Sequence, residues 1–113
     1  MFYIDEDQNI TLTRSDSARI ELTVYNEAGE AYDFSNDLTQ FTVKRNTVTE
    51  DIIFQKTFTG GVITIDPSDT KDLYYDDMVY DVQLITPDND VYTVIDPAKF
   101  ILGKEVNFNV SRS

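Results

Sequence analysis

The sequence predicts an all-β protein, and its composition carries that prediction. Isoleucine and valine together number 20 of the 113 residues, whereas alanine and leucine together number 10. Thirteen threonines, seven tyrosines and seven phenylalanines also suit a pleated, half-buried surface. Aspartate outnumbers glutamate 15 to 6, and aspartate stabilises turns by bonding its own backbone. A chain of this length fits one domain, which we expect to span residues 1–113.

Alternation of apolar and polar residues predicts seven or eight strands. The clearest alternation lies at Ala18–Tyr25, where Ile20, Leu22 and Val24 share one face. In chain order the expected strands are Asn9–Thr13, Ala18–Tyr25, Thr39–Arg45, Asp51–Phe58, Val62–Ile65, Met78–Thr86, Val91–Ile95, and Lys99–Val110 as one bent strand or two short ones. A short extended piece at Ala31–Phe34 is a further candidate beside these strands. Within Asp51–Phe58 the pattern places Ile52, Phe54 and Phe58 on one face, and within Lys99–Val110 it places Val106, Phe108 and Val110 in period two. Residues 1–8 are expected to be a flexible N-terminal segment.

Turn and cap signals connect these strands. Thr59-Gly60-Gly61 predicts a tight hairpin, because paired glycines supply the positive φ that such turns need. Asp66 as a cap, with Pro67 at the first helical position, predicts a one-turn helix over Pro67–Leu73.

Many short strands separated by turns favour an immunoglobulin-like antiparallel β-sandwich, with a small β-barrel as the alternative. Tyr80 stands two residues before the inward Val82, which is the spacing of the tyrosine corner in such sandwiches. The cysteine pair and the tryptophan of antibody domains are absent.

Charge and missing residue types exclude several functions. With 9 basic and 21 acidic residues the net charge is −12, which disfavours nucleic acid and anionic membranes as partners. Neither histidine nor cysteine occurs, so the sequence excludes disulfides, zinc sites built on these residues, cysteine nucleophiles and the Ser-His-Asp triad. The start of the chain lacks the pattern of a signal peptide, so we expect the protein to remain in the cytoplasm that makes it.

Carboxylates supply the remaining chemical candidates. Asp76 and Asp77 together with Asp81 offer a pair at the spacing that glycoside hydrolysis uses, but solvated turn carboxylates explain them better. We therefore expect no catalytic residues and no cofactor. For metals, Asp88, Asn89 and Asp90 form a weak calcium candidate, as does the run Asp5-Glu6-Asp7; turn geometry is the competing explanation for both.

Five residues are candidates for contact with a partner. Tyr74, Tyr75 and Tyr92 present a ring with a polar tip, which suits a protein partner or a sugar. Val79 and Ile85 are apolar residues on the polar face of Met78–Thr86, and such residues are often covered by loops or by another subunit. Residues 66–96 hold nine acids and one base, whereas residues 97–113 hold three bases and one acid. This asymmetry suggests head-to-tail assembly of copies of the chain.

Several stretches resemble a known family. They are Leu12–Ser17, Ile65–Leu73 and Val79–Leu84, continued by Tyr92–Ile95 and Lys99-Phe100. Together they resemble small immunoglobulin-like structural proteins of tailed bacteriophages and prophages of Gram-positive bacteria, including the N-terminal domains of baseplate upper proteins. The resemblance implies a non-enzymatic virion protein of baseplate, tail, neck or capsid surface, assembled in the host cytoplasm. Its partners would be other virion proteins or copies of itself. A carbohydrate-binding or host-surface-binding module, assisted by calcium, is the alternative.

Overall fold

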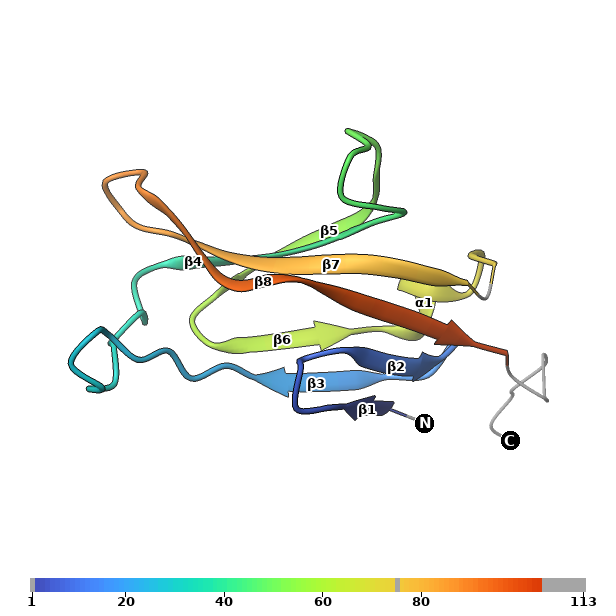
Figure 1. Cartoon of the computed structure of the whole chain (residues 1–113), viewed down its shortest axis with the longest axis horizontal. Helices are drawn as coiled ribbons and strands as arrows, with labels where there is room; N and C mark the ends of the chain where they lie inside the picture. The colour runs from blue at the N-terminus through green and yellow to red at the C-terminus, as the bar shows by residue number, and fades with distance from the viewer. Residues whose placement is uncertain (1, 75, 105–113) are drawn as a thin grey trace.

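The computed structural model describes residues 2–74 and 76–104, and these form eight strands and one short helix (Figure 1). The strands are β1 (Phe2–Ile4), β2 (Ile10–Thr13), β3 (Ala18–Glu21), β4 (Leu38–Lys44), β5 (Ile52–Thr59), β6 (Val62–Ile65), β7 (Asp77–Ile85) and β8 (Val91–Gly103). The helix α1 spans Pro67–Thr70. The predicted all-β class is confirmed.

The strands form two layers, as in a β-sandwich. The larger sheet has the order β1-β2-β8-β7-β4-β5, and the smaller sheet pairs β3 with β6. The run β8-β7-β4-β5 opposite β3-β6 follows the strand order of immunoglobulin-like domains. One pair departs from the predicted antiparallel arrangement, because β2 runs parallel to β8 with Ile10 beside Phe100.

The core lies between the two sheets and follows the predicted alternation. Phe41, Val43, Val82 and Leu84 are buried on the large sheet, and Ile63 and Ile65 face them from β6. Four aromatic rings, from Phe41, Phe54, Tyr80 and Phe100, form contacts with centroids 5.2–6.5 Å apart. Such tilted and edge-on pairs are the favoured packing of aromatic side chains.

The predicted hairpin at Thr59-Gly60-Gly61 is wrong. Gly60 has the expected positive φ of 81°, but β5 pairs with β4 and β6 pairs with β3. The two glycines therefore carry the chain from one sheet to the other. Gly61 lies so close to the Phe34 ring that a Cβ atom added there would stand 2.8 Å from its Cζ.

Two predicted strands are shorter than expected. The strand predicted over Ala18–Tyr25 ends at Glu21, because Glu21 pairs with Val62, the first residue of its partner strand. In place of the predicted piece over Ala31–Phe34, Ala31 forms a single bridge with Tyr25.

Bulges change two further details. Between Val43 and Lys44 the register of β4 with β5 shifts, so Ile53 is an extra residue and Ile52 is opposite Lys44. Ile52 is consequently exposed, whereas Phe54 and Phe58 pack against the core as predicted. Strand β8 continues through Asp96 and Pro97, which lie in a bulge opposite β7. The period-two residues Val106, Phe108 and Val110 lie outside the described residues.

The N-terminal segment is part of the sandwich rather than a flexible arm. Strand β1 pairs antiparallel with β2, and Phe2 packs against the core. Tyr80 donates its hydroxyl hydrogen bond to the carbonyl of Gln8. The predicted tyrosine corner is therefore not formed in its usual way, since that hydroxyl normally bonds backbone a few residues upstream. Here it fixes the connection between β1 and β2.

The helix begins where the sequence predicts and is shorter. Asp69 accepts the backbone N–H of Asp66 at 2.8 Å, and Pro67 occupies the first turn. Lys56 on β5 binds the Asp69 carboxylate at 2.8 Å and that of Asp66 at 3.2 Å, which ties the helix to the large sheet. Leu73, which follows the helix, is partly buried and packs against the core.

Candidate functional site

The side of the large sheet that faces away from β3 and β6 is its most extensive uncovered surface among the described residues; we call it the outer face. Two of the five partner-contact candidates, Val79 and Ile85, lie on it and are half-buried. By strand register, the outer face comprises Tyr3, Thr11, Thr13, Leu38, Gln40, Thr42, Lys44, Ile52, Gln55, Thr57, Thr59, Asp77, Val79, Asp81, Gln83, Ile85, Val91, Thr93, Lys99 and Ile101.

The outer face carries almost no net charge. Its register-paired charged groups are the carboxylates of Asp77 and Asp81 and the ammonium groups of Lys44 and Lys99, and the formal charges of these four sum to zero. Asp96 has no register partner; it lies with Pro97 in the bulge of β8 opposite Asp81, and its carboxylate adds one negative charge beside this face. The whole chain has a net charge of −12, so its acidity is concentrated elsewhere.

An apolar row crosses three adjacent strands at one end of the outer face. Leu38 on β4 is directly opposite Ile85 on β7, and Ile85 is directly opposite Val91 on β8. The side chains of Leu38 and Val91 are 42% and 54% exposed, so the row is in contact with solvent. Uncharged polar side chains continue the face beyond it. Gln55 donates to the Thr42 hydroxyl at 2.9 Å, and Gln83 donates to the Thr93 hydroxyl at 3.4 Å.

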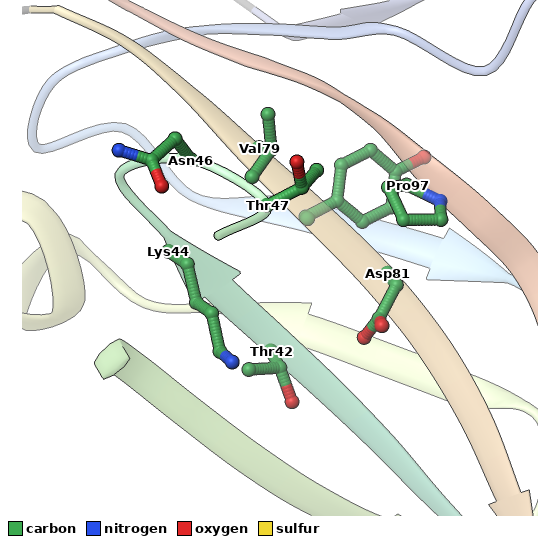
Figure 2. A pocket seen from close by; sticks show the side chains of 8 residues that line it. Thr42, Lys44, Asn46, Thr47, Val79, Asp81 and Pro97 are labelled. Carbon is green, nitrogen blue, oxygen red and sulfur yellow. The ribbon is translucent and has the colours of Figure 1, made fainter. Parts of the chain in front are cut away.

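A small pocket of about 90 Å³ indents the outer face beside the β4–β5 loop (Figure 2). Its lining includes Thr42, Lys44, Asn46, Thr47, Val79, Asp81 and Pro97. Partial burial raises the pKa of Asp81 above its ordinary value, and the positive charge of Lys44 opposes that shift. The Lys44 ammonium donates to the Thr49 carbonyl at 3.3 Å. This volume is far below the roughly 300–1,000 Å³ of ordinary ligand sites, so the pocket suits a protruding side chain or a few waters.

Tyr92 does not share the outer face with Val79 and Ile85. It is opposite Leu84, so its side chain is on the inner side of the sheet, at the open end of the sandwich. There it lines a groove of about 470 Å³, which we call the tyrosine groove. The groove is lined by Val24, Tyr25, Asn26, Glu27, Tyr32, Leu84, Thr86, Tyr92 and Val94.

The other two tyrosine candidates are elsewhere. Tyr74 lies in the connection between α1 and β7 and is 86% exposed, at the opposite end of the sandwich from the tyrosine groove (Figure 1). Tyr75 lies outside the described residues. The five partner-contact candidates therefore do not form one site.

The two calcium candidates have turn geometry. Asn89 has a φ of 67° and donates its N–H to the Thr86 carbonyl at 2.9 Å, and the Asp90 N–H binds the Thr86 hydroxyl at 3.0 Å. In the other loop, Asp5 accepts the N–H groups of Asp7 and Asn9. Within residues 2–74 and 76–104, no group of three or more acidic, histidine or cysteine side chains is placed to hold a metal ion.

Among the carboxylates weighed for catalysis, Asp77 and Asp81 share the outer face of β7 but are four residues apart, which is about 13 Å along a strand and beyond the spacing that glycoside hydrolysis uses. Asp76 accepts the Asp77 N–H at 2.7 Å and lies 3.4 Å from the Arg45 guanidinium. Asp81 is on the outer face in the small pocket. The hydrogen bonds and the ion pair of Asp76 are those of a turn residue.

The pattern along the chain missed the residues that complete both surfaces. Leu38 and Val91 join Ile85 only through the register of three strands. Tyr25 and Tyr32 join Tyr92 only because the β3–β4 connection and the β7–β8 hairpin lie at the same end of the molecule. In the sequence, the only indication of the tyrosine groove was the presence of tyrosines within polar segments.

Comparison of the chain with protein-family models, with curated proteins and with solved structures finds no match. Among the described residues, no helix has the length and apolar character needed to cross a bilayer.

Proposed function

We propose that this protein is a non-enzymatic structural module of a tailed-phage particle and that it acts through protein–protein contacts made by the outer face. The observation that carries the proposal is the low net charge of this face, on which two carboxylates and two ammonium groups balance, in a chain of net charge −12. The resemblance of Ile65–Leu73 and Val79–Leu84 to phage structural proteins supports the virion setting.

The charge distribution favours a second copy of the chain as the partner. Two copies that each carry −12 repel one another, and that repulsion is smallest where the contacting surfaces are neutral. The outer face also offers an apolar row, Leu38, Ile85 and Val91, that two-fold packing would cover. A face-to-face contact therefore fits these charges better than the head-to-tail arrangement that the sequence suggested.

The size of the outer face is adequate for such a contact. The six strands of the large sheet contain 44 residues, and at about 3.4 Å along the strand and 4.8 Å between strands they cover about 700 Å². A stable interface of standard size buries about 800 Å² on each partner.

Native mass spectrometry and sedimentation velocity of Ile85→Lys test the proposal. Placing a charge in the apolar row should weaken self-association by about tenfold or more, because a buried ammonium without a partner opposes docking. Tyr74→Lys is the matched control, since it introduces the same charge at an exposed aromatic residue in the α1–β7 connection, outside the strand register of the outer face. Equal association of both variants, or a wild-type monomer at every concentration, would contradict the proposal.

The virion setting has its own test. Particles purified from a host that carries the gene should contain the protein when analysed by mass spectrometry. Purified particles that lack it would show that the protein acts outside the virion.

A further inference from the structure

The tyrosine groove is a second surface, on the opposite side of the large sheet from the outer face. Its residues come from three parts of the chain, which are the β3–β4 connection, the end of β7 and the start of β8. At about 470 Å³ it lies within the range of small-molecule sites, whereas the pocket on the outer face does not. None of the contacts proposed for the outer face uses it.

One wall of the groove is held rigid. The Tyr32 ring stacks on Phe34, with centroids 6.4 Å apart and planes 6° apart. Its hydroxyl donates to the Asp37 carboxylate at 2.9 Å, and Asp37 is 4% exposed. This hydrogen bond is the main cause of a raised pKa at Tyr32, which stays a neutral phenol at physiological pH. A fixed ring loses little entropy when a ligand packs against it.

The rings of the other two tyrosines, Tyr25 and Tyr92, are exposed to solvent. Tyr25 and Tyr92 are 64% and 56% exposed, although large aromatic side chains are usually more buried. Tyr25 is held by its bridge to Ala31, and the N–H of Tyr32 binds the Val24 carbonyl at 2.8 Å. These contacts hold the two halves of the β3–β4 connection against each other. Two phenol rings from the β3–β4 connection and one from β8 thus line the same groove.

The polar lining sets the chemistry of the ligand. The side-chain oxygen Oδ1 of Asn26 accepts the backbone N–H groups of Ala28 and Glu30, which leaves the side-chain NH₂ group of Asn26 as the donor for a ligand. Glu27, Thr86 and the tyrosine hydroxyls add acceptors and donors. Glu27 is the charged residue of the lining, and with a net charge of −12 the protein repels anions. A purely aliphatic ligand would leave these polar groups without partners.

We propose that the tyrosine groove binds a neutral pyranose unit of a glycan. The C–H face of the sugar packs on the tyrosine rings, and its hydroxyls exchange hydrogen bonds with Asn26, Glu27 and Thr86. The charge of the groove excludes sialylated and phosphorylated sugars.

Titration of the ¹⁵N-labelled full chain, followed by amide NMR spectra, tests this site. The neutral probes are maltotriose, cellotriose and chitotriose; sialyllactose is the anionic comparison, and an oligoproline peptide represents the other ligand class that uses aromatic grooves. At least one neutral trisaccharide should give saturable shifts at residues 24–32 and 84–94, with no such response to sialyllactose. A groove that responds to none of the three neutral sugars, or only to oligoproline, overturns the proposal.

Variants separate this site from the outer face. Tyr92→Ala should weaken sugar binding by about tenfold or more, because the ring is an exposed wall of the groove. Tyr25→Ala provides a second variant at an exposed position, and Tyr74→Ala is the control outside the groove. Ile85→Lys should bind sugar like the wild type, so loss of self-association and loss of sugar binding are distinguishable. Unchanged affinity in both groove variants contradicts the assignment.

Discussion

Tyr80 connects the N-terminal segment to the core through one hydroxyl group. The side chain is 3% exposed, and burial, aided by the negative charge of Asp5, raises its pKa to about 12. Tyr80→Phe removes the hydrogen bond to the Gln8 carbonyl and leaves the ring packing in place. We expect the free energy of unfolding to fall by about 1–2 kcal/mol in urea denaturation. Tyr74→Phe, at an exposed ring, should match the wild type.

If Tyr80→Phe were as stable as the wild type, the hydroxyl would not hold the N-terminal segment. Residues 2–9 would then rely on the pairing of β1 with β2 and on the contact of Asn9 with β8, where the Asn9 side-chain oxygen accepts the Lys99 N–H at 2.9 Å.

At the scale of elements, the turn that moves the chain between sheets depends on Gly61. A Cβ atom there would lie 2.8 Å from the Phe34 ring and 3.0 Å from the Leu22 carbonyl oxygen. Gly61→Ala should therefore destabilise the fold by about 1–3 kcal/mol in urea denaturation, as overpacking does. Gly103→Ala is the matched control, because its nearest neighbour would be 3.9 Å away. Similar stability of the two variants would show that Phe34 moves aside without cost.

The alternation of side chains predicted most elements, because burial on one face imposes period two on a strand. Strands β4, β6 and β7 lie where that pattern placed them, and Asp66-Pro67 marked the start of α1. The pattern does not specify which strand pairs with which. Adjacent strands in sequence usually form hairpins, so Gly60-Gly61 was interpreted as one, and the sheet change depends on contacts with Phe34 and Leu22 that are distant in sequence.

The candidate sites were predicted only in part for the same reason. Val79, Ile85 and Tyr92 were identified singly, as apolar or aromatic residues in polar surroundings. Only the register shows that Ile85 and Tyr92 are on opposite sides of one sheet. The balance of charge on the outer face likewise arises from residues on several strands, so it cannot be recognised in any single segment of the sequence.

At the scale of the whole molecule, acidity and apolar surface are distributed between different regions. The carboxylates lie mainly in turns, in the helical connection and at loop tips, while the outer face is neutral. In such an arrangement, the charged turns and loop tips keep copies apart at the edges and ends of the molecule, whereas the outer face leaves one surface where two copies can associate.

The central claim, that two copies pack outer face to outer face, is tested most directly by distance measurement between spin labels. The chain has no cysteine, so a nitroxide can be placed at one chosen site. Gln83→Cys puts the label near the middle of the outer face, and Arg19→Cys puts it on the exposed side of the small sheet.

Double electron–electron resonance should give a single inter-copy distance for the Gln83 label. The Arg19 distance should be longer by about 20 Å, which is two interlayer spacings of roughly 10 Å each. An Arg19-labelled protein that stays monomeric, or a dimer in which the Arg19 distance is shorter than the Gln83 distance, would contradict the claim.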